Sequence, residues 1–249
     1  MTTLPSARPI TITMTANPPD DAFVAYYDSE WLAKADYFRL HRQRFLQTWA
    51  FVVRQGLAPG GQVLDIGGIG PVAAYLQTTA PWQAFETKTD LREPLPLPSD
   101  DFDLVLCTET IEHIKDKESS AIGDLEAFNY SGALQLLSEL ARVVRPSGCV
   151  VLTTPNANSY ITLHKWLHGQ LLLMDPAHVR EYSPEDLVRV ARMAGLRMLG
   201  LEVSDSWEAE FDPSLATLKD ALEALPALPA LQTIARQDNI LASFVKANG

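Results

Sequence analysis

The chain has 249 residues, of which 47% are hydrophobic, and this suits one large globular domain or one such domain with a small cap. Acidic side chains outnumber basic ones by 31 to 20, and the formal net charge of -11 disfavours a polyphosphate partner such as nucleic acid. No run approaches the roughly 20 apolar residues of a membrane span, and residues 1–20 lack the apolar segment of a signal peptide. We therefore expect a cytoplasmic protein without nucleic-acid or membrane partners.

The first 58 residues divide into two parts. Residues 1–20 are rich in Thr and Pro, which predicts a loose N-terminal arm. Over residues 21–58, aromatic and apolar residues recur at mixed spacings of three, four and seven, which predicts two helices that end at Gly56. We expect these helices to form a helical cap on a main domain that spans residues 59–249.

Apolar runs and turn signals alternate along the rest of the chain. They predict strands over 62–66, 82–88, 102–108, 149–153, 196–203 and 239–246. They predict helices over 71–77, 131–145 and 183–194, and a short helix with turns within 211–229. Ser183 is a natural N-cap before Pro184, and Gly195 closes that helix. Alternating strands and helices predict an α/β fold with a doubly wound, mostly parallel sheet and helices on both faces.

The two cysteines, Cys107 and Cys149, each lie in an apolar run that is predicted to be a strand. A cysteine in such a run is most often a small buried hydrophobic residue. The sequence therefore predicts neither a disulfide framework nor a metal cluster, and it fits a reducing compartment.

A glycine turn between a predicted strand and helix, residues 63–70, is the first chemical signal. Glycines there let a ligand approach the backbone and the N-terminus of the helix. The pattern Gly68-x-Gly70-x-x-Ala73 also matches a dinucleotide fingerprint. Asp65 argues against a dinucleotide, because its carboxylate would repel a pyrophosphate and attract a cationic ligand. A purely structural Asp65 that caps the turn amides is the other interpretation.

Four further motifs follow in order: TDLREPLPLPSDDFDLV over 89–105, CTETIEHI over 107–114, RVVRPSG over 142–148 and VLTTPN over 151–156. Together with the glycine turn, they resemble the class I S-adenosylmethionine-dependent methyltransferases, in the small-molecule group that includes the ubiquinone-pathway type. The resemblance runs from about residue 59 to 201 and over the last strand. Ile69 and Pro71 depart from it, since the family usually has glycines at these positions.

The resemblance implies a Rossmann-like methyltransferase fold of about six or seven strands, with the last strand antiparallel. It implies S-adenosylmethionine as the cosubstrate and S-adenosylhomocysteine as the product. Only about twenty residues separate Gly70 from Asp90, where the full family pattern needs a helix and another strand. One strand of the sheet is therefore expected to be missing or very short.

The same resemblance implies a set of cofactor-binding residues. An acidic residue after the second strand grips the ribose hydroxyls in the family; Glu86 and Asp90 are the candidates, and we favour Asp90. The other implied contacts lie in the glycine turn and at the carboxyl ends of the second and fourth family strands: Asp65, Ile66, Gly67, Gly68, Gly70, Leu91, Thr108, Glu109 and His113.

Methyl transfer to a hydroxyl requires a general base, and His is the side chain best suited to this near neutral pH. His113 follows the fourth family strand, and His178 precedes the capped helix. Both are candidate catalytic residues, with His178 slightly preferred as the base, although either could only hold a loop by hydrogen bonds. No His, Asp or Glu spacing with a recognised context indicates a metal site, so none is expected.

Three segments are candidates to shape an acceptor pocket. Residues 21–56 carry a positive cluster, residues 160–174 are strongly apolar, and residues 115–130 are polar enough to form a flap. The run HVREYS over 178–183 is similar to a segment of bacterial relatives, many of them beside sugar or cell-surface biosynthesis functions. We expect a small-molecule acceptor, with oxygen favoured as the acceptor atom; the oligomeric state stays open.

Two other functions remain. The pattern Gly68-x-Gly70-x-x-Ala73 allows a nicotinamide-dependent oxidoreductase, which NAD would protect against heat. The irregular first motif allows a non-catalytic protein on a methyltransferase scaffold, which would bind the cofactor weakly or not at all.

Overall fold

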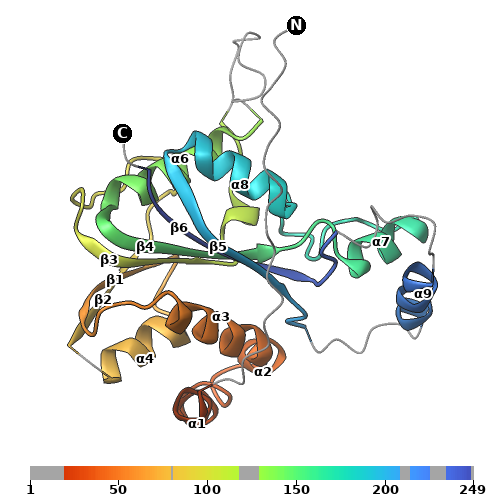
Figure 1. Ribbon diagram of the computed structural model, residues 1–249, viewed down its shortest axis with the longest axis horizontal. Helices are drawn as coiled ribbons and strands as arrows, with labels where there is room; N and C mark the ends of the chain where they lie inside the picture. Colours follow the sequence, from red (N-terminus) through yellow and green to blue (C-terminus); the bar gives the residue numbers. More distant parts are fainter. Residues whose placement is uncertain (1–19, 80, 118–128, 208–213, 225–233, 248–249) are drawn as a thin grey trace, which may run out of the picture.

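The computed structural model describes residues 20–79, 81–117, 129–207, 214–224 and 234–247 (Figure 1). The N-terminal arm expected over residues 1–20 lies outside this part of the chain except for Asp20, which caps the first helix. Most of the expected flap over 115–130 and much of 211–229 also lie outside it.

A six-stranded sheet forms the centre of the described structure (Figure 1). Its strand order is β2-β1-β3-β4-β6-β5; β1 to β4 pair in parallel, and β6 is antiparallel to both of its neighbours. This confirms the expected doubly wound, mostly parallel sheet with an antiparallel last strand. The strands are β1 (Gly61–Ile66), β2 (Trp82–Thr87), β3 (Phe102–Thr108), β4 (Val144–Pro155), β5 (Leu196–Ser204) and β6 (Asn239–Lys246).

The sheet is one strand shorter than the full family pattern, as the short spacing after Gly70 predicts. Helix α4 (Pro71–Thr79) follows the glycine turn, and β2 comes directly after it. From residue 88 to 101 the chain then runs in turns and bends to β3, without a further strand in that fully described stretch. Strand β2 therefore forms an edge of the sheet, next to β1.

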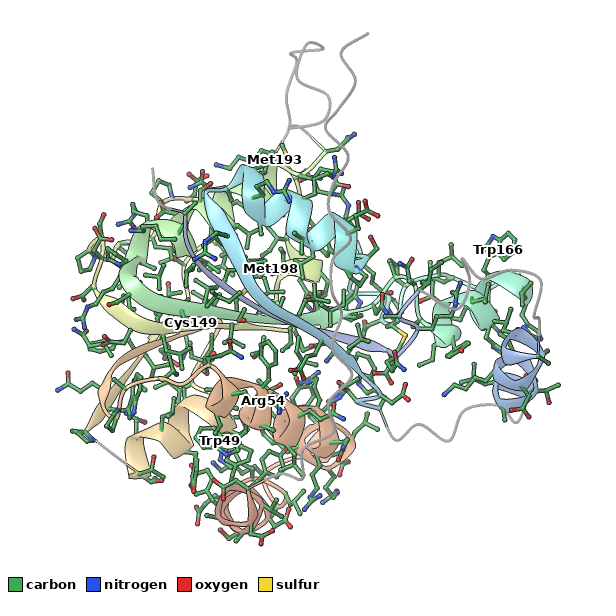
Figure 2. All side chains as sticks on the ribbon, in the orientation of Figure 1. Trp49, Arg54, Cys149, Trp166, Met193 and Met198 are labelled. Atoms are coloured by element: carbon green, nitrogen blue, oxygen red, sulfur yellow. The ribbon has the colours of Figure 1, made fainter. Side chains whose placement is uncertain are left out.

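Helices cover both faces of the sheet (Figure 1). Helices α6 (Ser131–Val143) and α8 (Pro184–Met193) pack on one face, where a buried cluster includes Leu136, Leu140 and Leu187. Helices α1 (Asp21–Glu30), α3 (Arg42–Arg54) and α4 pack on the other. There Trp49 of α3, which is labelled in Figure 2, stacks on Phe23 with the ring centroids 5.1 Å apart. Because this second cluster also contains β1 and β3 residues, the N-terminal helices share a core with the sheet.

The N-terminal segment forms three helices, where the sequence predicts two. The short helix α2 (Asp36–Leu40) lies between α1 and α3. Ala35 before it has an extended backbone conformation, and His41 after it is also non-helical. The residues on either side of these breaks keep the apolar spacing of a helix, so periodicity alone does not reveal them.

Strand β4 is longer than expected, and it includes residues 144 and 145, which the sequence predicts to be the end of the preceding helix. Helix α6 stops at Val143, not at residue 145, and β4 begins at Val144, because Val144 has φ -70° and ψ 139°. Pro146 lies near the register shift between Phe102 and Leu104 of the neighbouring strand β3, a position where a sheet tolerates proline. The capped helix agrees with the sequence: the Ser183 hydroxyl accepts the Asp186 N–H over 3.1 Å.

Helices α7 (Tyr160–Leu167) and α9 (Ser214–Glu223) form a small pair beyond the carboxyl ends of β4 and β5 (Figure 1). Trp166 projects from α7 away from the sheet and is 63% exposed (Figure 2). Cys107 and Cys149 are buried free thiols, as expected. In the described segments, no helix combines the length and the apolar character needed to cross a membrane.

Candidate active site

The glycine turn closes around Asp65 at the carboxyl end of β1. Gly67 and Gly68 have φ values of +91° and +140°, a backbone region in which side chains are strained. The Gly70 N–H donates a hydrogen bond of 2.8 Å to Oδ2 of Asp65. Burial raises the pKa of Asp65 to about 7, so its carboxyl gains and loses its proton within the neutral range.

Glu86 lies at the end of β2, directly opposite Asp65 in the strand register. Its Oε2 accepts the Ile69 N–H over 3.2 Å, so a β2 carboxylate contacts the glycine turn. The Lys88 ammonium, 2.8 Å away, holds the pKa of Glu86 below its usual range. The carboxylate is therefore ionised at neutral pH.

Asp90, the favoured ribose contact, has a different place. The Arg92 guanidinium binds its carboxylate over 2.6 Å and holds the pKa of Asp90 below its usual range. Asp90 is exposed, and neighbouring Leu91 packs against the core cluster under α6. Neither of these residues lines the cavity at the glycine turn, and neither does Glu86, although Glu86 contacts the turn backbone. The structure thus brings Glu86 to the turn and leaves Asp90 and Leu91 outside it.

A cavity of about 480 Å³, which we call the turn cavity, lies over the glycine turn. It is formed where β1 and β3 end, and the chain leaves these strands in opposite directions along the sheet. Ligands of open α/β sheets bind at such a switch point. The expected cofactor residues that line it are Asp65, Ile66, Gly67, Gly68, Gly70, Thr108, Glu109 and His113.

Glu109 occupies an unusual backbone position just after β3. Its φ of +48° is rare for a residue other than glycine, and strain of this kind concentrates at functional sites. Its carboxylate accepts hydrogen bonds from Thr153 Oγ1 over 2.8 Å and Asn239 Nδ2 over 3.1 Å. The buried guanidinium of Arg44 on α3 lies 3.6 Å from its other oxygen. These contacts fix Glu109 at the wall of the turn cavity.

A second cavity of about 470 Å³, the outer cavity, adjoins the first. Tyr37, Arg44, Glu109 and His113 line both cavities. The outer cavity is enclosed by α2 and α3 on one side and by α7 and the loop before α8 on the other. Its remaining lining residues are Leu40, His41, Glu112, Ile161, Lys165, Met174, Asp175, His178 and Trp207.

The two candidate catalytic histidines meet in the outer cavity. Their ring centroids lie 4.8 Å apart with nearly perpendicular planes. The Val179 N–H donates a 2.7 Å hydrogen bond to the Glu112 carbonyl, which holds the His178 loop against the segment that carries His113. Nδ1 of His178 lies 3.0 Å from the Glu181 carboxylate, and Nδ1 of His113 lies 3.2 Å from the Ala177 carbonyl.

Glu112 is the buried carboxylate beside them. Its side chain is 0% exposed, and its Oε2 accepts a 2.9 Å hydrogen bond from Thr154 Oγ1. Oε1 has no hydrogen-bond partner and lies 4.0 Å from Nε2 of His113. Burial, with the charge of Glu109, raises the pKa of Glu112 well above its usual range.

Several cavity residues carry no recognisable signal in the sequence. The Arg44 guanidinium lies over the Tyr37 ring, 5.5 Å from its centroid. Its Nη2 also donates a hydrogen bond to the Tyr37 hydroxyl over 2.5 Å. Trp207 donates a 2.9 Å hydrogen bond from Nε1 to Nδ1 of His41. Burial, with the charge of Arg44, lowers the pKa of His41 to about 4, so this imidazole is neutral. Of the positive cluster expected in residues 21–56, only His41 and Arg44 line the outer cavity.

The apolar segment 160–174 contributes less to the outer cavity than expected. Ile161, Lys165 and Met174 line it. The large apolar side chains Trp166, Leu167, Leu171 and Leu172 are all exposed. The end of α7 and the loop after it therefore expose their apolar side chains to solvent. The Lys165 ammonium donates a hydrogen bond to the Leu173 carbonyl over 2.6 Å.

The dinucleotide interpretation of the turn conflicts with this geometry. A pyrophosphate needs the free N–H groups at the start of the helix. The Asp65 carboxylate already accepts the Gly70 N–H there and presents a buried acid to the same space. The site is therefore better suited to a ligand with a positive charge.

Comparisons with known proteins agree with this fold. A family model described as a methyltransferase domain matches residues 37–201. No curated protein matches the chain.

Three solved structures share the fold at low identity. The methyltransferase partner in the Haloferax volcanii complex with the Trm112 activator, described there as putative, is 16% identical with a TM-score of 0.53, over 94% of this chain and 100% of that one. A SAM-dependent methyltransferase from Archaeoglobus fulgidus is 19% identical with a TM-score of 0.51, over 81% and 94%. A possible histamine N-methyltransferase from Thermotoga maritima is 16% identical with a TM-score of 0.50, over 91% and 97%. Because the family model covers most of the chain, the protein belongs to the methyltransferase-domain family.

Proposed function

We propose that the protein binds S-adenosylmethionine in the turn cavity and transfers its methyl group to a hydroxyl of a small molecule in the outer cavity. One observation carries this proposal: the two cavities share the wall formed by Tyr37, Arg44, Glu109 and His113. A methyl donor and its acceptor must meet in line, and adjoining cavities allow this with little water between them.

The turn cavity offers complementary groups for the cofactor. Asp65 is a buried carboxylate, which a ligand carrying a sulfonium and an ammonium would ionise and neutralise. Gly67 and Gly68 present bare backbone, so the methionine end can approach closely. Glu86 is ionised beside the turn, and we propose it, in place of Asp90, as the acceptor of the ribose hydroxyls.

The outer cavity suits a small acceptor. Its volume of about 470 Å³ falls in the range of small-molecule sites. The faces of Tyr37 and Trp207 can pack against a flat or cyclic acceptor, while the neutral His41 and the Lys165 ammonium add polar contacts. A sugar or another secondary or cell-surface metabolite with a free hydroxyl fits these features.

The transfer itself is a displacement at carbon. The acceptor oxygen forms a bond to the methyl carbon, the sulfur–methyl bond breaks with its electron pair left on sulfur, and the hydroxyl proton is given up. His178 and His113 are the groups we propose to handle that proton, because both line the outer cavity and His113 also lines the turn cavity. An Nε2 lone pair can take the proton itself or can bind a cation that acidifies the hydroxyl.

Titration of the purified protein with S-adenosylhomocysteine by calorimetry tests the cofactor assignment. We expect saturable one-to-one binding that Asp65→Ala abolishes, and no binding of NAD. Binding of NAD without S-adenosylhomocysteine would support an oxidoreductase instead. Binding of neither compound would favour a scaffold without this chemistry.

Methyl transfer is then tested with S-adenosylmethionine and a panel of hydroxyl-bearing sugars and metabolites, by following formation of S-adenosylhomocysteine. Turnover of a hydroxyl acceptor supports the proposal, and turnover confined to amine acceptors would contradict the choice of oxygen.

A further inference from the structure

We propose that Oε1 of Glu112 and the Nε2 atoms of His113 and His178 form a binding site for one divalent transition-metal cation. The spacing of these residues along the chain gives no indication of such a site, because His178 comes from a distant loop. The inference deepens the proposed function and rests on it only for the role of the cation, not for its binding.

The three side chains already lie close together. One ligand atom from each of the three residues lies within 4.8 Å of the others, and Oε1 of Glu112 is 4.0 Å from Nε2 of His113. Metal–ligand bonds of about 2.0–2.2 Å need these atoms slightly closer together. The His113 side chain is 42% exposed and can rotate inward, while Glu112 and His178 are held by their neighbours.

The hydrogen bonds of both imidazoles leave the correct nitrogen for a metal. A backbone carbonyl can only accept, so Nδ1 of His113 donates to Ala177, and its Nε2 carries a lone pair. Nδ1 of His178 lies 3.0 Å from the Glu181 carboxylate, which is 3% exposed and also accepts the Met174 N–H. A metal-binding histidine is typically oriented in this way, by a carboxylate or carbonyl on its other nitrogen.

Glu112 supplies an independent sign of a missing partner. Its Oε1 is buried and has no hydrogen-bond partner, although an unpaired buried carboxylate oxygen is costly. Glu109, the neighbouring buried carboxylate, already faces the Arg44 guanidinium. A cation between Glu112 and the two histidines would stabilise the ionised form of Glu112 and give its Oε1 a partner.

Two nitrogens and one oxygen select the class of metal. Imidazole and carboxylate ligands together suit Zn²⁺, Fe²⁺ or Mn²⁺, whereas Ca²⁺ and Mg²⁺ prefer sites built from oxygen. Three protein ligands leave coordination positions open toward the outer cavity, where the acceptor lies.

A hydroxyl bound to the cation there is acidified. It releases its proton to solvent as the oxygen attacks the methyl carbon and the electron pair stays on sulfur. With the cation bound, the two histidines act on the hydroxyl through the metal, which is the second of the two roles proposed for them above, and neither is the free base.

Binding of Mn²⁺ to the metal-free protein tests the site without any activity assay. The protein is stripped with a chelator, and free Mn²⁺ is followed by its electron paramagnetic resonance signal, with Zn²⁺ as competitor. We expect one Mn²⁺ per chain, displaced by Zn²⁺. His113→Ala, His178→Ala and Glu112→Gln should each weaken binding by more than about 100-fold, and Glu181→Gln by about 10- to 100-fold.

His168→Ala is the matched control, because His168 is an exposed histidine of the α7 end outside the cavity. It should bind Mn²⁺ like the wild type. Failure of the wild type to bind, or equal binding by the wild type and His178→Ala, would overturn the site. Circular dichroism and thermal unfolding of each variant show that the variant is folded, because His113 also lines the turn cavity and its loss could weaken cofactor binding directly.

The two proposals fail in different ways. Binding of S-adenosylhomocysteine without Mn²⁺ would overturn the cation site and leave the methyltransferase proposal intact. Binding of Mn²⁺ by these three residues without S-adenosylhomocysteine would uphold the site and overturn its role in methyl transfer.

Discussion

The Asp65 carboxylate and the Gly70 N–H close the glycine turn on itself through a hydrogen bond of 2.8 Å. The same carboxylate is buried at the floor of the turn cavity, so it has both a structural and an electrostatic role. The two interpretations that the sequence left open, a cap for the turn and a partner for a cationic ligand, are therefore compatible. Two substitutions separate their contributions.

Asp65→Asn keeps an oxygen that can accept the Gly70 N–H, whereas Asp65→Ala removes both the acceptor and the charge. We expect Asp65→Ala to abolish binding of S-adenosylhomocysteine in calorimetry. Asp65→Asn should weaken binding by about 1.5–3 kcal/mol, the usual contribution of a hydrogen bond to a charged group. Equal affinities of Asp65→Asn and the wild type would show that the charge plays no part.

Binding of the cofactor should depend on pH because the pKa of Asp65 is raised to about 7 by burial. Below this pKa the carboxyl is neutral, and a cationic ligand must displace its proton. Affinity for S-adenosylmethionine should therefore rise as the pH increases from about 6 to 8. The rise should be absent in Asp65→Asn, and a rise of the same size in that variant would assign it to another group.

Glu86 and Asp90 form a matched pair for the ribose assignment. Glu86 contacts the turn through the Ile69 N–H, while Asp90 is engaged by Arg92 outside the cavity. We expect Glu86→Gln to weaken S-adenosylhomocysteine binding, and Asp90→Asn to leave it nearly unchanged. The reverse order in calorimetry would restore Asp90 as the ribose contact.

Asp238 should make the stability of the protein depend on pH. It accepts the Ser206 N–H over 2.7 Å and the Trp207 N–H over 3.2 Å, and burial raises its pKa from 3.8 to about 7. The folded state thus holds this proton more tightly than the unfolded state. The associated stability is fully present below about pH 3.8 and is lost as the pH rises through about 7.

Urea unfolding of the wild type and Asp238→Asn at pH 5 and pH 8 checks this sign. The asparagine does not titrate, so its stability relative to the wild type should increase between pH 5 and pH 8. A constant difference between the two proteins would mean that Asp238 has no raised pKa.

Gly132, at the start of α6, fixes the chain that follows the candidate site. A Cβ at this position would lie 2.2 Å from the Lys115 carbonyl oxygen, and backbone cannot move aside easily. We expect Gly132→Ala to lower the free energy of unfolding by about 1–3 kcal/mol, as overpacking does. It should also shift the segment from His113 to Lys115 and weaken Mn²⁺ binding.

Gly169→Ala is the control for this substitution, because a Cβ there meets nothing within 4 Å and only the positive φ of +64° is unfavourable. It should cost about 1–2 kcal/mol in unfolding free energy and leave Mn²⁺ binding unchanged. A Gly132→Ala protein that binds Mn²⁺ like the wild type would show that α6 does not position His113.

Local patterns in the sequence were sufficient to locate the framework. The run from Phe102 to Thr108 is a strand with the predicted bounds, because a strand buried on both faces is apolar throughout. Ser183 caps α8 through a local contact, because its hydroxyl accepts the N–H of Asp186, just three residues along the chain. The sequence also predicts that one strand of the family pattern is absent, because the stretch between Gly70 and Asp90 is too short to hold it. These features depend on neighbours along the chain.

The chemistry of the site depends on contacts that the order of residues does not contain. His178 lies beside His113 because its loop hydrogen-bonds to the Glu112 carbonyl, and Oε1 of Glu112 is unpaired because the fold buries it. Glu86, and not Asp90, meets the glycine turn because β2 pairs with β1 in one particular register. The sequence by itself determined the strands, the turn and the family; tertiary packing decided which polar groups meet, since burial and distance arise only when separate elements pack together.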